Sequence, residues 1–115
     1  MYTVASADGT RIAYDRLGEG PAVILVNGAM GYRRFKKFDQ IATSLSEHCT
    51  VINYDRRGRG DSGDSASYAA EREIDDLAAV IGYAGGPAGV FGHSSGAVLA
   101  LEAAARGLAR VSGVS

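Results

Sequence analysis

The sequence predicts an α/β fold, in which helices cover both faces of a mainly parallel sheet. Along the chain, segments with the hydrophobic pattern of β-strands, either alternating or unbroken, are followed by segments whose apolar residues recur at helical spacing. From residue 22 onward, three helical stretches separate four short apolar ones, and this succession is the usual connection between parallel strands. A length of 115 residues without internal repeat or linker indicates one domain, residues 1–115.

The first half of the chain predicts a hairpin, a central strand and a helix. Two short strands, residues 2–5 and 11–17, flank the turn sequence Asp8-Gly9. Residues 22–26 read AVILV, which is apolar on both faces of a strand and rich in β-branched side chains, as a buried parallel strand requires. A helix over about residues 35–46 follows, with its apolar side chains at helical spacing: Phe35, Phe38, Ile41, Ala42 and Leu45.

The second half predicts three more strands and two more helices. The strands are residues 50–54, 89–91 and 111–114. A polar, glycine-rich loop, residues 55–66, precedes the second helix. The apolar face of that helix consists of Ile74, Leu77, Ala78 and Ile81. The third helix, residues 97–106, is apolar nearly all round, so we expect it to be sandwiched between other parts of the protein.

The composition excludes several classes of function. Hydrophobic residues make up 46% of the chain and charged residues 22%, as in ordinary folded proteins. A net charge of −1 gives no electrostatic reason to expect a nucleic acid or a membrane as partner. The single cysteine, Cys49, cannot form an internal disulfide, and the chain starts without a basic and apolar secretion signal. We therefore expect a soluble cytoplasmic protein.

The motif that carries chemistry is GHSSG at residues 92–96, between a predicted strand and a predicted helix. In this sequence and context, G-x-S-x-G is the nucleophile elbow, which holds a serine on a sharp strand-to-helix turn. The residues two before and two after the serine come very close together there, so only glycine fits at positions 92 and 96. We expect a positive φ at Ser94, and we expect the helix start to aim N–H groups at a developing oxyanion.

Three signatures in this order resemble those of a known family. They are NGAM at residues 27–30, YDRRGRGDS at residues 54–62 and the elbow at residues 92–96. The chain resembles the N-terminal half of an α/β-hydrolase-fold protein of the esterase, lactonase and haloperoxidase-like group, apparently truncated after the nucleophile helix. The resemblance covers the chain from the first hairpin to the strand at residue 111.

The resemblance implies a role for each matching residue. Ser94 matches the nucleophile, and the backbone N–H groups of Ser95 and Ala29 match the two oxyanion-hole donors. Asn27 stands where the family usually has histidine, which alters the hydrogen bonding of the oxyanion loop but leaves its main-chain donor. The resemblance also implies that the substrate pocket is lined by Asn27, Gly28 and Met30, although loop packing accounts for Met30 equally well.

The general base and the acid of a triad are missing after Ser94. The 21 residues that follow it contain no histidine, no aspartate and one glutamate, Glu102, which lies two helical turns away from the elbow. His93 is interpreted as a packing residue and His48 as a capping or surface residue. We therefore expect the acid and base in a missing C-terminal half, and the chain alone to be inactive and unstable as a monomer.

Two functions remain open on the sequence. One is a serine hydrolase acting on a small-molecule ester, lactone, thioester or amide; the other is a catalytically inactive ligand-binding module of the same fold. Within the enzyme class, a cofactor-free haloperoxidase or a C–C bond hydrolase also fits the elbow. No cofactor or metal site is expected. Residues 58–63 match G-x-G-x-x-G, but three residues separate them from the strand, so a dinucleotide site is not expected there. Arg56, Arg57 and Arg59 are interpreted as loop anchors that bond carbonyls and carboxylates.

Overall fold

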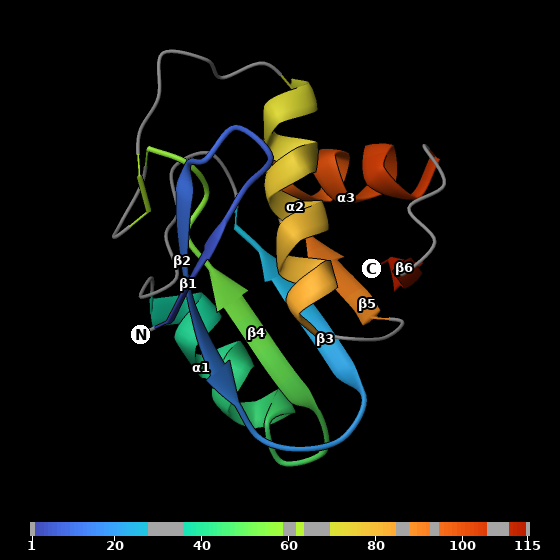
Figure 1. Ribbon diagram of the computed structural model, residues 1–115. Helices are drawn as coiled ribbons and strands as arrows, with labels where there is room; N and C mark the ends of the chain where they lie inside the picture. The colour runs from blue at the N-terminus through green and yellow to red at the C-terminus, as the bar shows by residue number, and fades with distance from the viewer. Residues whose placement is uncertain are drawn as a thin grey trace.

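The computed structural model describes residues 2–27, 36–58, 62–63, 70–84, 88–92, 95–105 and 111–114 (Figure 1). Strands and helices alternate after an initial hairpin, which confirms the α/β class. The elements are β1 (Tyr2–Ala5), β2 (Arg11–Leu17), β3 (Ala22–Val26), α1 (Lys36–Leu45), β4 (Thr50–Tyr54), α2 (Ala70–Ala84), β5 (Ala88–Gly92), α3 (Ser95–Ala105) and β6 (Val111–Val114).

The predicted bounds differ from these mainly around the elbow. Helix α3 begins at Ser95, two residues earlier than predicted, and β5 runs to Gly92. Serine and glycine are weak helix formers, so their place in the first turn of α3 comes from the packing of that turn on the sheet. Helix α1 is one residue shorter at each end than predicted.

The sheet brings three strand ends to one edge. Its order is β1-β2-β4-β3-β5-β6, and the strands from β4 to β6 are parallel. Val26, the last residue of β3, is in register with Tyr54 of β4 and with Gly92 of β5. The arrowheads of β3, β4 and β5 accordingly point to the same edge in Figure 1. The segments that follow these strands therefore start side by side, at the edge where open α/β sheets bind ligands.

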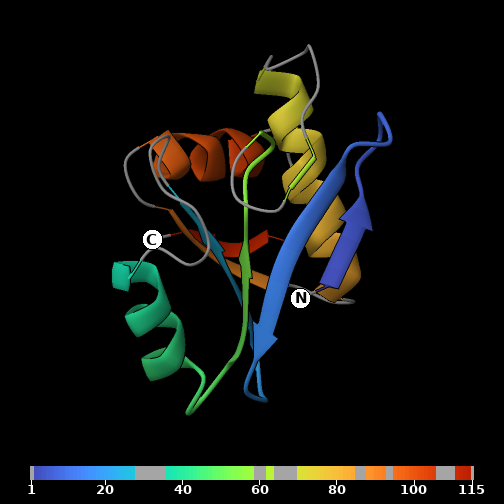
Figure 2. The same cartoon turned by 90° about the vertical axis from the view of Figure 1, so that its left-hand side faces the viewer.

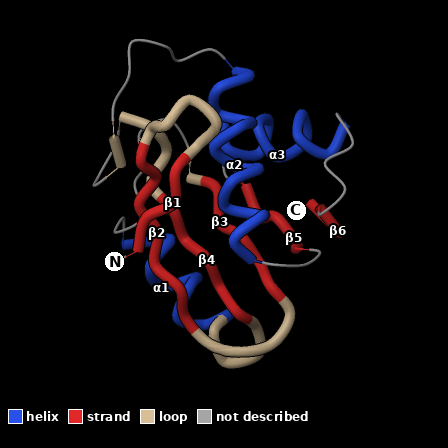
Figure 3. The backbone as a smooth tube through the Cα atoms, in the orientation of Figure 1, coloured by secondary structure: helices blue, strands red, loops and turns tan. Residues whose placement is uncertain are grey.

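Helices lie on both faces of the sheet. Figure 2 shows α1 on one side and α2 on the other, and Figure 3 shows the β1–β2 hairpin and β6 at opposite edges. The larger core lies between the sheet and helices α2 and α3, and includes Ile24, Val26, Leu77 and Ala100. The smaller core, under α1, contains Leu25, Ala42 and Val51. Strand β3 contributes to both cores, as its unbroken apolar sequence predicts.

Helix α3 is covered on one face only in the part of the chain that the structure describes, so the cover expected for its other face is not found among these residues. Leu99, Ala100 and Ala103 are buried, whereas Val98 is 67% exposed and Leu101 is 59% exposed. Among the described elements, α3 packs against α2 and the strands β3, β5 and β6. No helix in the described ranges has both the length and the apolar character needed to cross a membrane.

Candidate active site

The predicted elbow lies at the carboxyl edge of the sheet. Strand β5 ends at Gly92 and α3 begins at Ser95, so the strand-before and helix-after context of the motif is confirmed. Ser94 and His93 themselves lie outside the described residues, as do Gly28, Ala29 and Met30. Ser95 is described as the first residue of α3. The first four N–H groups of an α-helix have no partner within the helix, which suits the donor role that the resemblance implies for Ser95.

Two glycines pack so closely around the elbow that a side chain at either would overlap backbone. A Cβ atom on Gly92 would lie 2.5 Å from the carbonyl oxygen of Gly96 and 2.6 Å from the nitrogen of Ala97. A Cβ atom on Gly96 would lie 2.6 Å from the carbonyl oxygen of Asn27 and closer still to that of Val26. The crowding expected between positions 92 and 96 is therefore present, and the start of α3 also touches the end of β3.

Asn27 is the last described residue before the predicted oxyanion loop. It is 1% exposed, and its Nδ2 donates a hydrogen bond of 3.4 Å to Oδ1 of Asn53 on the neighbouring strand β4. Its main-chain carbonyl accepts a hydrogen bond of 3.2 Å from Nη1 of Arg56. Both the side chain and the backbone of Asn27 are thus held by residues at the end of β4.

Arg56 is held in turn by a carboxylate of α2. Its Nε donates a hydrogen bond to Oε1 of Glu73 and its Nη2 donates one to Oε2, each at 2.8 Å. The Arg56 side chain is 7% exposed and the Glu73 side chain 15% exposed. This is the bidentate geometry, in which two parallel N–H groups of a guanidinium bind the two oxygens of one carboxylate. The interpretation of Arg56 as a loop anchor that binds carbonyls and carboxylates is confirmed, with the particular residues Asn27 and Glu73 supplied by the structure.

Arg57 is an anchor of a second kind. Its side chain is fully buried, with Nη2 2.6 Å from Oδ1 of Asp76 on α2 and Nη1 2.9 Å from Oδ2 of Asp8 in the β1–β2 turn. The hydrogen bond to Asp76 is the largest cause of the raised pKa of Arg57. Hydrogen bonds from Arg57 and Thr10 hold the pKa of Asp8 below its usual range. Arg57 is therefore a structural cation that binds two carboxylates; Arg59 lies outside the described residues.

The loop that follows β4 is fixed to β2. The hydroxyl of Ser62 donates to the carbonyl of Asp55 at 2.6 Å and accepts from the N–H of Ala13 at 2.9 Å. The N–H of Gly63 donates to the carbonyl of Arg11 at 2.6 Å. Ser62 and Gly63 therefore pack against the hairpin, and they lie well before α2, which begins at Ala70. A dinucleotide fingerprint would open the helix, so this arrangement does not fit one.

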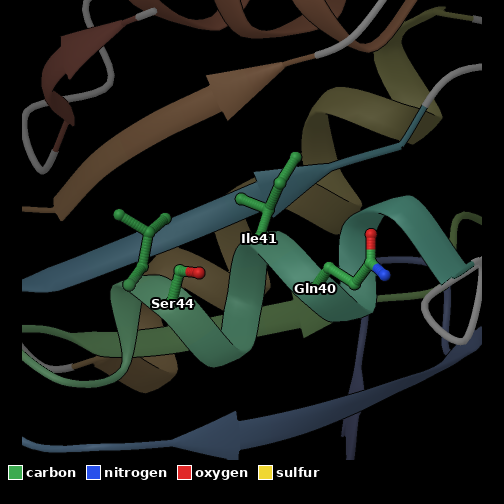
Figure 4. Close-up of a pocket in the computed structure, with 4 residues that line it drawn as sticks. Gln40, Ile41 and Ser44 are labelled. Carbon is green, nitrogen blue, oxygen red and sulfur yellow. The ribbon is translucent and has the colours of Figure 1, made fainter.

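The remaining candidates lie away from the strand ends. His48 is exposed just after α1, where its N–H donates to the carbonyl of Leu45 at 3.0 Å, so its interpretation as a surface residue is confirmed. A hollow of about 330 Å³ is lined by four residues of α1: Gln40, Ile41, Ser44 and Leu45. Figure 4 shows Ile41 pointing from α1 toward the sheet. None of these residues follows a strand end, so this hollow is not the predicted substrate pocket.

Comparisons with known proteins agree with this geometry. The model of the alpha/beta hydrolase family matches residues 23–115. An alpha/beta hydrolase from Sphaerobacter thermophilus has a solved structure with 57% identity and a TM-score of 0.92, over 98% of this chain and 43% of its own. A putative aryl esterase from Burkholderia cenocepacia has 31% identity and a TM-score of 0.84, over 98% of this chain and 44% of its own.

A curated relative gives the same assignment. The uncharacterized hydrolase YraK of Bacillus subtilis is 38% identical over 98 residues, which is 82% of this chain and 35% of that protein. The chain thus spans less than half the length of these relatives. Fold, strand-end geometry, family model and relatives lead to one conclusion: the chain belongs to the alpha/beta hydrolase family.

Proposed function

We propose that the full-length gene product is a serine hydrolase that cleaves a small-molecule ester, lactone, thioester or amide by acyl transfer through Ser94. The observation that carries the proposal is the packing of Gly92 against Gly96, with β5 ending and α3 beginning on either side of Ser94. Such crowding is what a nucleophile elbow requires. Relatives named as a hydrolase and a putative aryl esterase support the reaction class.

The proposed reaction follows from the groups at the strand ends. The Ser94 hydroxyl attacks the substrate carbonyl, and the N–H groups of Ser95 and Ala29 stabilise the resulting oxyanion. A serine hydroxyl needs a neighbouring base at neutral pH. We propose that this base and its acid partner come from the part of the gene product outside residues 1–115. The chain alone is then inactive. Gly28 and Met30 contribute to the substrate pocket, and the buried Asn27 supports it through its hydrogen bonds with Asn53 and Arg56.

The same proposal covers partner and location. The remainder of the gene product is the proposed cover for the outer face of α3, where Val98 and Leu101 are exposed. We further propose a cytoplasmic location, supported by a free cysteine, Cys49, that lacks a disulfide partner.

The test is covalent labelling and hydrolysis with the full-length gene product. A fluorophosphonate should label Ser94, as located by peptide mass spectrometry, and p-nitrophenyl esters should be hydrolysed. Ser94→Ala should abolish labelling and lower kcat by about 10³-fold or more. Ser95→Ala is the matched control, because its proposed contribution is a backbone N–H, and it should keep kcat within about tenfold. Ester binding without labelling or turnover would instead favour a binding module.

A further inference from the structure

Arg56 connects helix α2 to the start of the predicted oxyanion loop. We infer that Arg56, held in place by Glu73, is a positioning residue that orients the peptide following Asn27 and thereby the oxyanion donor at Ala29. This inference rests on the proposed function, because it assigns a role within the same site. It concerns residues that neither the elbow motif nor the oxyanion loop contains.

The guanidinium of Arg56 is held in a fixed orientation. Two parallel hydrogen bonds of 2.8 Å to Glu73 hold the guanidinium plane in one orientation. Helix α2, which carries Glu73, packs against α3, β1 and β3. Nη1 is thereby aimed at the Asn27 carbonyl from a fixed base, at 3.2 Å. A flexible cation could bind the same carbonyl but could not fix its direction.

Arg56 binds the carbonyl of the peptide that leads into the predicted oxyanion loop. The Asn27 carbonyl belongs to the planar peptide that joins Asn27 to Gly28, so fixing its oxygen also fixes the direction of the Gly28 N–H. Ala29 is one residue further along. Two backbone dihedral angles at Gly28 then separate the fixed peptide from the proposed donor. The hydrogen bond from Arg56 therefore acts at the root of the oxyanion loop.

The same Asn27 carbonyl also touches the first turn of α3, which carries the other proposed donor, Ser95. A Cβ atom on Gly96 would lie 2.6 Å from the Asn27 oxygen, so this oxygen lies between Arg56 and the first turn of α3. That turn begins with Ser95, the second proposed donor. Arg56 thus holds Asn27, the residue that precedes the loop of one proposed donor, against the helix that carries the other.

Electrostatics support positioning over simple charge. The carboxylate of Glu73 compensates the Arg56 cation within a largely buried pair, with side chains 7% and 15% exposed. A compensated buried pair is weak evidence for stability, yet its geometry is well defined. Lysine at position 56 would keep the charge but lose the fork that binds Glu73 and Asn27 together.

The experiment compares Arg56→Lys and Glu73→Gln with Asp75→Asn in the full-length gene product. Asp75 is the matched control, because it forms a partly exposed ion pair with Arg72 on the same helix, at 3.2 Å. We expect Arg56→Lys to lower kcat by about 10- to 100-fold, with KM changed less than about threefold, because small misplacements of catalytic groups act on the transition state. Glu73→Gln should have a smaller effect in the same direction, and Asp75→Asn none.

A second readout separates positioning from loss of structure. A trifluoromethyl ketone that adds to Ser94 forms an oxyanion, so its inhibition constant should rise by the same factor as kcat/KM falls. A product carboxylic acid should bind with unchanged affinity. Rates are expressed per active site titrated with the fluorophosphonate, which removes any unfolded fraction.

The outcomes distinguish this inference from the proposed function. If the wild type is labelled and Ser94→Ala is inactive, but Arg56→Lys keeps its kcat per titrated site, the inference is overturned and the proposed function stands. The inference is also overturned if kcat falls without a matching rise in the inhibition constant of the ketone. If the wild type is not labelled at all, the proposed function itself fails, and this inference with it.

Discussion

Replacement of Gly96 by alanine should destabilise the protein, although alanine is the better helix former. Gly96 lies in the first turn of α3, and Gly82 lies near the end of α2. A Cβ atom on Gly82 would have no atom within 4 Å, whereas one on Gly96 would overlap the carbonyls of Val26 and Asn27. The same substitution in two helices therefore isolates the effect of the close approach.

The magnitude follows from the geometry at Gly96. The new methyl group would lie 2.6 Å from the Asn27 oxygen and closer still to that of Val26, whereas ordinary van der Waals contact begins at 3.4 Å, so the backbone must move by at least about 0.8 Å. Overpacking with backbone shifts costs about 1–3 kcal/mol. At Gly82 nothing opposes the helix propensity of alanine, which should raise the free energy of unfolding by about 0.5–1 kcal/mol.

Urea unfolding followed by circular dichroism, with the full-length gene product, measures both values. Gly96→Ala should also lower kcat by about 100-fold, because a displacement approaching 1 Å would separate the two oxyanion donors. Equal stability of Gly96→Ala and Gly82→Ala, together with an unchanged kcat, would refute the argument that α3 and β3 touch at this point.

Three other predictions concern buried charge, acid and the open helix face. Asp76→Asn should lower the free energy of unfolding by about 3–5 kcal/mol in urea, because it leaves Arg57 buried with one fewer carboxylate; the partly exposed control Asp75→Asn should cost less than about 1 kcal/mol. The lowered pKa of Asp8 contributes stability above its ordinary pKa that is lost as the pH falls. Below about pH 4, wild-type stability should therefore fall more steeply than that of Asp8→Asn, and parallel pH profiles would contradict this. Leu101→Lys should destabilise the full-length gene product by about 1.5–3 kcal/mol if the remainder covers α3, and a change within about 0.5 kcal/mol would show an open face.

The strands were predictable because their signals are local. Five of the six have the predicted bounds, since β-branched runs are interrupted by glycine, proline and polar residues. The crowding at Gly92 and Gly96 was predictable as well, because a tight turn excludes side chains whatever the rest of the fold does. Local sterics and periodicity therefore account for the architecture and for the glycines of the elbow.

The hydrogen-bonding partners were not predictable in the same way. The sequence shows arginines in a loop, but their pairing with Glu73 and Asp76 depends on how α2 lies over the end of β4. Asn53 is a polar residue at a buried position of β4, and this was the available signal for a partner of Asn27. The one-sided cover of α3 depends likewise on which elements reach it, because an all-apolar helix has no preferred face.

The buried Arg57 also has a consequence for the order in which the chain folds. It forms hydrogen bonds with Asp8, 49 positions earlier in the chain, and with Asp76, 19 positions later. Contacts of such separation require loop closure before they contribute any stability. The guanidinium should thus acquire its carboxylates after the sheet has assembled, so changes at this cluster would accelerate unfolding and leave the folding rate nearly unchanged. Arg57 then forms its contacts late in folding, and these contacts slow the separation of the hairpin from α2 in the folded protein.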